Sequence, residues 1–252
     1  MGNWTTTVRR MIPRRQLHKV LNTGRQITGL FYSGNKMECP ICGKKARKFM
    51  PYGITKRPNA MCPHCFSLER HRLLWLYLKN ETGLFEGKPK LLHVAPEQCY
   101  MKPLERLLGD NYLTADLDSP LAKIKMNIQA IPFPDGEFDV IFCNHVLEHV
   151  DDDRQAMREF YRVMKPGGWG VLLVPINANR TTTHEDPTIT DKKGREKAFG
   201  QWDHVREYGT DYTDRLREAG FTVETVEYAK AVSPEQQAYY SLGNDTLYIV
   251  RK

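Results

Sequence analysis

Long hydrophobic runs are missing from this sequence. No stretch of about eighteen apolar residues, the length that a membrane-spanning helix needs, occurs in its 252 residues. The basic N-terminal stretch is not followed by the apolar segment of a secretory signal either. With 40% hydrophobic and 27% charged residues, the chain has enough apolar material for a buried core and a polar surface. These features predict a cytoplasmic protein without a membrane span.

Acidic residues are scarce in residues 1–72, where fifteen Lys and Arg are accompanied only by Glu38 and Glu69. The formal net charge of the whole chain is +7, so the remaining residues carry a net negative charge. This asymmetry favours an acidic partner for the first part, such as RNA, DNA, a phosphorylated carrier or the acidic part of the same chain. A solvated basic surface explains it equally well. We interpret residues 1–37 as a basic N-terminal arm with a short helix around 13–22.

Four of the six cysteines form two C-x₂-C pairs, namely Cys39, Cys42, Cys62 and Cys65. Each pair places two thiolates on one tight turn, and two such turns provide the four ligands of a tetrahedral Zn²⁺. Two disulfides, or four unrelated thiols, are the alternatives. Four protein ligands leave no open coordination position, so this metal would be structural. We expect a small four-cysteine zinc module plus a helix over residues 38–82, with Ser67 capping the helix.

From Lys90 onward, short apolar segments alternate with helical patterns. The segments expected to be strands are 90–95, 111–117, 138–143, 171–175, 222–228 and 246–251. The segments expected to be helices are 101–108, 152–164 and 212–219. Such alternation predicts an α/β fold with a doubly wound, mainly parallel sheet. Gly83, Gly87 and Pro89 mark a boundary before this domain, which we place at residues 88–252.

The segment 131–175 contains IPFPDGEFDVIF, then LEH, then RVMKPGG. It resembles the class I S-adenosylmethionine-dependent methyltransferases, in particular the methyltransferase type 11-like branch. The resemblance covers roughly residues 90–251 and implies a seven-stranded sheet whose last strand is antiparallel. It also implies an enzyme that transfers a methyl group from S-adenosylmethionine.

Ligands of such sheets bind beyond the carboxyl ends of the strands. The resemblance places the cofactor on residues that follow strands, namely Ala95, Glu97, Asp116, Leu117, Asn127, Ile128, Asn144 and His145. Asp116 would bind the ribose, with Asp118 as a rival for that role. Asn127 would accept a hydrogen bond from the adenine amino group, next to the backbone N–H of Ile128.

The first of these loops departs from the family pattern, because residues 93–98 contain no glycine where the family is glycine-rich. Two interpretations remain open. Either Glu97 binds the amino group of the cofactor through a reshaped loop, or cofactor binding is weakened or lost.

An unusually long segment, about residues 177–210, separates the fifth strand from the next helix. Segments of this length in a compact domain are commonly functional lids. We expect an acceptor-binding lid in which His204 or His184 is the general base and Arg206 holds an anionic group. The alternative is that His204 and Arg206 merely tie the segment to the sheet.

His145, Glu148 and His149 form an H-x-x-E-H pattern after the fourth strand. His145 is a third catalytic candidate. A second divalent metal at these three residues would lower the pKa of an acceptor hydroxyl. The alternative is a packing and capping role for the L-E-H segment.

The expected reaction is methyl transfer to an O or N nucleophile of a small-molecule or glycan acceptor. This acceptor is favoured because residues 1–72 show no interleaved aromatic and basic stacking surface. One alternative is an RNA methyltransferase that holds RNA on the basic zinc module. Another is a non-catalytic zinc-ribbon adaptor with a degenerate methyltransferase domain.

Overall fold

The computed structural model describes residues 28–53 and 55–252. The helix predicted around 13–22, and most of the expected N-terminal arm, lie outside these residues. The chain forms two compact units. The first contains residues up to Glu86 together with Glu97–Leu104 and Glu227–Asp245, and the second contains Gly87–Pro96, Glu105–Val226 and Thr246–Lys252. Within the described residues, no helix combines the length and apolarity needed to cross a membrane.

The division after Glu86 falls inside the predicted boundary region, but a single continuous domain over 88–252 needs correction. Residues 97–104 and 227–245 group with the first unit, because they contact residues of that unit that lie far away in the sequence. The Tyr100 hydroxyl donates to the carbonyl of His71 at 2.7 Å.

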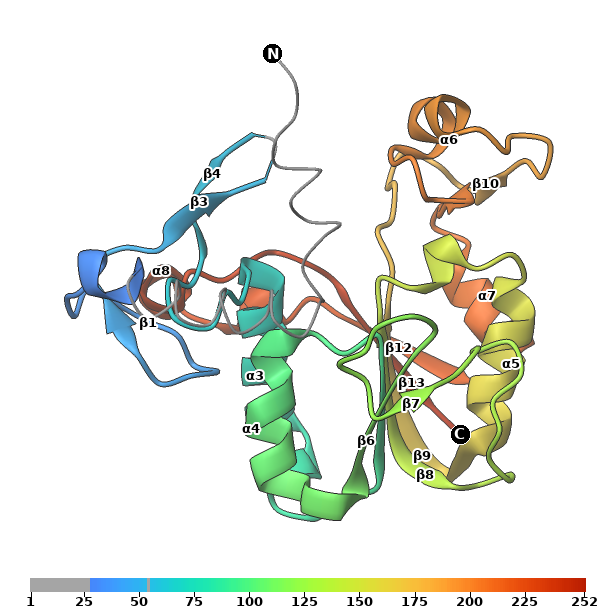
Figure 1. Ribbon diagram of the computed structural model, residues 1–252, viewed down its shortest axis with the longest axis horizontal. Coiled ribbons are helices and arrows are strands. Elements are labelled where there is room, and N and C mark those ends of the chain that lie inside the picture. Colours follow the sequence, from blue (N-terminus) through green and yellow to red (C-terminus); the bar gives the residue numbers. More distant parts are fainter. Residues whose placement is uncertain (1–27, 54) are drawn as a thin grey trace. The chain divides into compact units, whose positions relative to one another are not determined.

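The second unit is built on one seven-stranded sheet with the order β12-β13-β9-β8-β5-β6-β7 (Figure 1). The strands are β5 (Leu91–Val94), β6 (Tyr112–Asp116), β7 (Ile124–Lys125), β8 (Phe138–Asn144), β9 (Met164–Leu173), β12 (Thr222–Val226) and β13 (Leu247–Arg251). Strands β5, β6, β7, β8 and β9 run parallel to one another, whereas β13 is antiparallel to both β12 and β9. This arrangement confirms the predicted doubly wound α/β fold with an antiparallel last strand.

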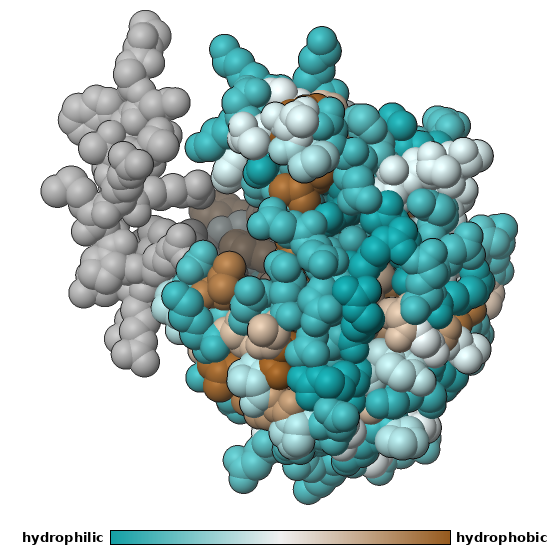
Figure 2. Space-filling model, turned by 90° about the vertical axis from the view of Figure 1, so that its right-hand side faces the viewer, coloured by the Kyte–Doolittle hydropathy of each residue, from teal (hydrophilic) through white to brown (hydrophobic). Residues whose placement is uncertain are grey.

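The central strands are continuous apolar runs because both faces of the sheet are covered. All four residues of β5 are buried. Helices α5 (Asp153–Val163) and α7 (Tyr212–Glu218) lie on the same side of the sheet (Figure 1). Figure 2 looks onto the side that carries them and shows a mainly hydrophilic surface. Asp152 caps α5 by accepting a hydrogen bond from the backbone of Gln155, which satisfies a free N–H of the first turn.

Strand β9 begins earlier than predicted. Met164 pairs with Phe138 of β8, and Trp169 pairs with Arg251 of β13, so the segment 165–168 lies inside the strand. The two-residue strand β7 was not predicted, since two residues carry no readable period.

The insertion between β9 and α7 is folded rather than an open loop. It contains β10 (His184–Glu185), α6 (Lys192–Phe199) and β11 (Arg206–Glu207), and β10 pairs antiparallel with β11. The remaining short helices of this unit are η2 (Gly109–Asn111) and η3 (Leu147–His149).

The first unit surrounds α3 (Glu69–Glu81), whose residues 71–78 are all buried. Its other elements are β1 (Met37–Glu38), β2 (Lys45–Ala46), β3 (Met50–Tyr52), β4 (Arg57–Met61), η1 (Gly83–Phe85), η4 (Tyr228–Ala231) and α8 (Pro234–Tyr240). Helix α4 (Gln98–Leu108) begins in this unit and ends in the other. The predicted cap at Ser67 is wrong, because the N-cap position is Leu68, whose N–H donates to His71 Nδ1 at 3.0 Å.

Candidate functional site

The four cysteines of the two C-x₂-C pairs converge in the first unit. Their sulfur atoms all lie within 4.8 Å of one another. Cys39 Sγ is 3.5 Å from Cys65 Sγ, and Cys42 Sγ is 3.9 Å from Cys62 Sγ. Sulfur ligands about 2.3 Å from a zinc ion stand about 3.8 Å apart in a tetrahedron, whereas bonded disulfide sulfurs are about 2 Å apart. The described cysteines form no disulfide, and the four sulfurs fit a tetrahedral metal ion.

Hydrogen bonds among the four thiols favour negative charge on Cys39, whereas the bonds to Cys39 raise the pKa of Cys42 and Cys65. Hydrogen bonds with the thiols of Cys42, Cys62 and Cys65 lower the pKa of Cys39 below its ordinary value. The Ser67 hydroxyl lies 3.2 Å from Cys39 Sγ. The hydroxyl that was expected to cap α3 therefore borders the sulfur cluster instead.

Arg72 is a buried cation that the sequence analysis did not single out. It is 0% exposed. Its guanidinium donates to four backbone carbonyls, at 2.6 Å to Ser67, 3.1 Å to Ala60, 2.7 Å to Tyr240 and 2.6 Å to Ser241. Burial lowers its pKa, and negative charge on the sulfur cluster opposes this effect. Arg72 thus connects Ser67, which follows the second cysteine pair, to the C-terminal part of the same unit.

Asp116 ends β6 at the carboxyl edge of the second unit's sheet. Its Oδ1 accepts from the backbone N–H groups of Asp118 and Ser119 at 2.8 and 2.7 Å. These bonds fix the carboxylate beyond the strand, and no described residue hydrogen-bonds Oδ2. The rival, Asp118, is exposed and lies 3.8 Å from Lys125. Leu117, between the two acids, is 55% exposed.

The loops after β5 and β8 both turn through a left-handed residue. Ala95 has a φ of 46° and His145 a φ of 55°. A residue with a side chain adopts this backbone conformation at a cost of about 1 kcal/mol or more, and such residues concentrate at functional sites. The first loop therefore makes its turn without the glycine that the family pattern contains. Because β5 and β8 are neighbouring parallel strands, Ala95 and His145 lie at the same edge of the sheet.

The other residues expected to bind the cofactor lie in three different environments. Asn127 is exposed, and its Oδ1 accepts from the backbone of Gln129 at 2.9 Å. Ile128 belongs to the hydrophobic core, so only its backbone is suited to contact a ligand. Asn144 is buried at the end of β8. Glu97 groups with the first unit, and its role stays a prediction.

Arg206 does not hold an anionic ligand, contrary to one interpretation of the sequence. It is 3% exposed, and its guanidinium donates to the carbonyls of Leu147, Val150 and Asp151 at 2.6–2.8 Å. It also donates to Glu185 Oε2 at 3.0 Å. With its donors occupied, Arg206 ties the insertion to the segment after β8, which was the alternative interpretation.

A second buried arginine supports the same junction. Arg215 of α7 donates to Asp153 at 3.2 Å and to Glu185 at 3.0 Å, and the Tyr208 hydroxyl donates to Asp153 at 2.6 Å. This network leaves no pattern in the sequence because its members are far apart along the chain. The acidic start of α5 was the only readable signal.

The three histidines proposed as catalytic groups lie in different places. His145 is at the strand edge, with 32% of its side chain exposed, and its Nδ1 is 3.6 Å from Glu148 Oε1. His184 lies in β10, where its ring contacts Phe199. His204 is buried, and burial lowers its pKa.

His204 comes together with the adjacent residues Glu148 and His149 although it lies far from them in the chain. One ligand atom of each lies within 4.8 Å of those of the others. His145, which was expected to complete a metal site with Glu148 and His149, is not part of this group.

A cavity of about 230 Å³ opens beside the insertion. Its lining includes Asn177, which follows β9, and Phe199, His204 and Glu207 from the insertion. It therefore lies near the carboxyl end of a central strand, where ligands of such sheets bind.

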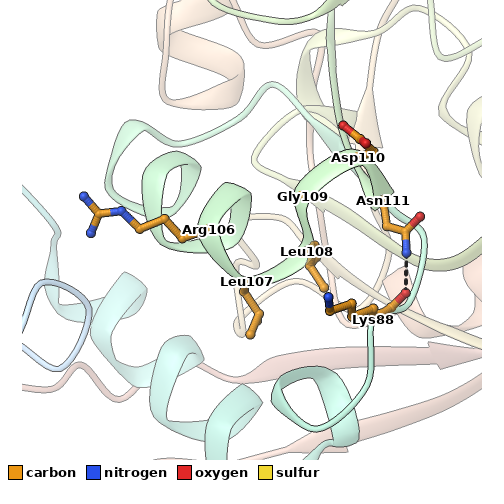
Figure 3. Close-up of a pocket in the computed structure, with 7 residues that line it drawn as sticks. All are labelled: Lys88, Arg106, Leu107, Leu108, Gly109, Asp110 and Asn111. Carbon is orange, nitrogen blue, oxygen red and sulfur yellow. Dashed lines mark hydrogen bonds between the residues drawn. The ribbon is translucent and has the colours of Figure 1, made fainter.

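A larger cavity of about 330 Å³ lies at the opposite edge (Figure 3). It is lined by Lys88 and Arg106–Asn111, and the Asn111 side chain donates to the carbonyl of Lys88 at 2.7 Å. Lys88 precedes β5 and Asn111 precedes β6, so this cavity borders the amino ends of the strands. It is therefore not a candidate for the cofactor.

Several known proteins are similar to this chain. A ubiquinone/menaquinone biosynthesis C-methyltransferase from Citrobacter koseri is 33% identical over 122 residues, 41% of this chain and 49% of that protein. Its counterpart from Hahella chejuensis is 44% identical over 155 residues, 54% of this chain and 62% of that protein. The chain thus spans about half the length of the first relative. A solved S-adenosylmethionine-dependent methyltransferase from Mesorhizobium loti shares 18% identity, with 71% of this chain and 98% of that chain covered and a TM-score of 0.47.

A family model described as a methyltransferase domain matches residues 102–172. This segment contains β6, β7, β8 and α5, and it reaches into β9. The match and the sheet order confirm the resemblance to the class I S-adenosylmethionine-dependent methyltransferases. The second unit therefore carries a methyltransferase domain.

Proposed function

We propose that this protein is an enzyme that transfers a methyl group from S-adenosylmethionine to an O or N nucleophile of a small-molecule or glycan acceptor. The carboxyl edge of the sheet carries the proposal, because Asp116, Ala95 and His145 end or follow neighbouring parallel strands there, and Asp116 and His145 lie in the segment that matches a methyltransferase domain. Oδ2 of Asp116 would accept the ribose hydroxyls, while Oδ1 stays bound to its own loop. The backbone of Ile128 and the side chain of Asn127 would bind the adenine.

A small acceptor is supported by the size of the cavity beside the insertion. Its 230 Å³ is below the roughly 300–1,000 Å³ of most ligand pockets, so a compact organic molecule or a single sugar unit would fill it. The relatives are named for C-methylation in ubiquinone and menaquinone biosynthesis. Methylation at carbon is therefore the first alternative to test for the acceptor atom.

His145 is the histidine best placed to accept the proton of the acceptor. It lies at the strand edge and is partly exposed, and Glu148 Oε1 faces its Nδ1 at 3.6 Å. A proton on Nδ1 would face this carboxylate, which leaves Nε2 to accept a proton. His204 is more enclosed, because its side chain is buried.

Bound S-adenosylmethionine supplies an electrophilic methyl group, so the chain has to position the acceptor and remove its proton. The left-handed turns at Ala95 and His145 would hold the loops in the required shape. The insertion would cover the acceptor and exclude water. Arg206 would tie the insertion to the segment after β8.

We further propose a structural Zn²⁺ bound by Cys39, Cys42, Cys62 and Cys65. Its role would be to fix the two knuckles of the first unit around Arg72. The four thiolates would leave no open position for a substrate.

Calorimetric titration of S-adenosylmethionine and its demethylated product tests the cofactor site. We expect micromolar binding to the wild type, loss of binding in Asp116→Ala, and near-normal binding in the neighbouring control Asp118→Ala. Absence of binding to zinc-loaded, folded wild type would contradict the proposal and favour the adaptor interpretation.

With binding established, an acceptor screen on wild type and His145→Ala tests the base. A turnover at least about tenfold lower at unchanged cofactor affinity is expected. Full turnover in His145→Ala would show that another group accepts the proton.

A further inference from the structure

We propose that Glu148, His149 and His204 form a second metal site that takes a divalent transition-metal ion of the zinc type. Two imidazoles and one carboxylate are a donor set suited to Zn²⁺ and to neighbouring first-row metals. One donor atom of each residue already lies within 4.8 Å of the others. Bonds of about 2.0–2.2 Å would bring them to about 3.3 Å, which small side-chain rotations achieve.

The carboxylate of Glu148 is the first observation that points to a cation. Its side chain is 2% exposed, and its Oε1 faces His145 Nδ1 at 3.6 Å. Its Oε2 is buried and has no hydrogen-bond partner among the described residues. A buried carboxylate oxygen without a partner is costly, and a bound cation removes that cost.

The hydrogen bonds of the two histidines are the second observation. His149 Nδ1 lies 3.1 Å from the carbonyl of Asp203, and His204 Nδ1 lies 3.2 Å from the carbonyl of Phe199. A carbonyl only accepts, so in both rings Nδ1 carries the proton and Nε2 carries a lone pair. Histidines that bind metals are typically held in this way, with the second nitrogen donating to a carbonyl or carboxylate.

The backbone holds the ligands together without a metal. The N–H of Val205 donates to the carbonyl of Glu148 at 2.9 Å, and the rings of His149 and His204 pack edge to face at 4.8 Å. The ion would therefore complete a junction between η3 and the insertion. Three protein ligands would leave one position for water or an acceptor oxygen.

Metal stoichiometry tests this site without cofactor or acceptor, so its outcome is independent of the proposed methyl transfer. The full chain would be equilibrated in a zinc buffer and its metal content measured by mass spectrometry. We expect two equivalents of zinc in the wild type, one of them at the four cysteines. Glu148→Gln and His204→Gln would retain one equivalent, and the control His184→Gln, from the same insertion, would retain two.

Cobalt distinguishes the two sites in the wild type itself. Added to protein whose cysteines are already zinc-loaded, Co²⁺ would produce weak visible bands of nitrogen and oxygen ligation without the intense thiolate-to-metal band. Its affinity would fall about tenfold or more in His204→Gln. A wild type that holds a single equivalent, or variants that all hold two, would overturn the proposal. If Glu148→Gln fails to fold, the wild-type stoichiometry and His204→Gln still decide the outcome.

Discussion

Replacing Arg72 by methionine is expected to destabilise the first unit by about 4 kcal/mol. The substitution keeps an unbranched apolar stem but removes a guanidinium that donates to four carbonyls. An unsatisfied buried acceptor costs about 1–3 kcal/mol. The bonds to Ser67 and Ala60 are fully buried and those to Tyr240 and Ser241 partly so, hence a total near 4 kcal/mol. Loss of the contact between Arg72 and the ring of Phe49, at 4.7 Å, adds to this.

Urea unfolding followed by circular dichroism, with zinc present in all samples, measures this effect. Lys79→Met on the exposed end of the same helix is the matched control, because it removes a cation without touching a carbonyl. Its free energy of unfolding is expected to change by less than about 0.5 kcal/mol.

Arg72→Lys separates charge from geometry. A lysine retains the cation beside the thiolates, but its single ammonium group cannot reach four separated carbonyls. We expect it to recover less than half of the lost stability. If Arg72→Met lowers the free energy of unfolding by less than about 1 kcal/mol, the assigned role of Arg72 is wrong.

Three further expectations concern the metal, an ion pair and a strained turn. Cys62→Ser should lose the zinc bound by the four cysteines, measured as a metal content lower by one equivalent. Burial raises the pKa of Glu185, but hydrogen bonds from Arg215 and Arg206 outweigh it and lower that pKa below its ordinary 4.5. The stability that this carboxylate contributes is thus present above about pH 4.5 and is lost as the pH falls further. The thermal midpoint of Glu185→Gln should therefore approach that of the wild type between about pH 5 and 3. A difference in thermal midpoint that does not change with pH would contradict the assignment. Ala95→Gly should keep the cofactor affinity and change the free energy of unfolding by at most about 1 kcal/mol, since glycine adopts a φ of 46° freely.

Several strands of the sheet were predictable because their signals are local. The apolar runs that became β5 and β8 stand out in the sequence, and the acidic start of α5 marks where that helix begins. The clustering of the four cysteines was predictable for the same reason, since each pair occupies one short turn.

The roles of single polar side chains were harder to predict, because burial and distant partners decide them. Ser67 has the residue type of a helix cap but lies beside a cysteine sulfur. Arg206 has the residue type of an anion binder, yet tertiary contacts with Val150 and Asp151 occupy its donors. His204 meets Glu148 only because the insertion folds back onto the segment after β8.

The C-terminal segment of the first unit determines when that unit can be completed during synthesis. The guanidinium of Arg72 donates to carbonyls that lie 168 and 169 positions further along the chain, so these bonds cannot form before that segment is synthesised. Residues 227–245 are made between β12 and β13, so the first unit stays unfinished until nearly all of the methyltransferase sheet has been translated. The two units can therefore complete their folding only at almost the same stage of synthesis. An N-terminal fragment ending at Glu86 would lack part of its own interior.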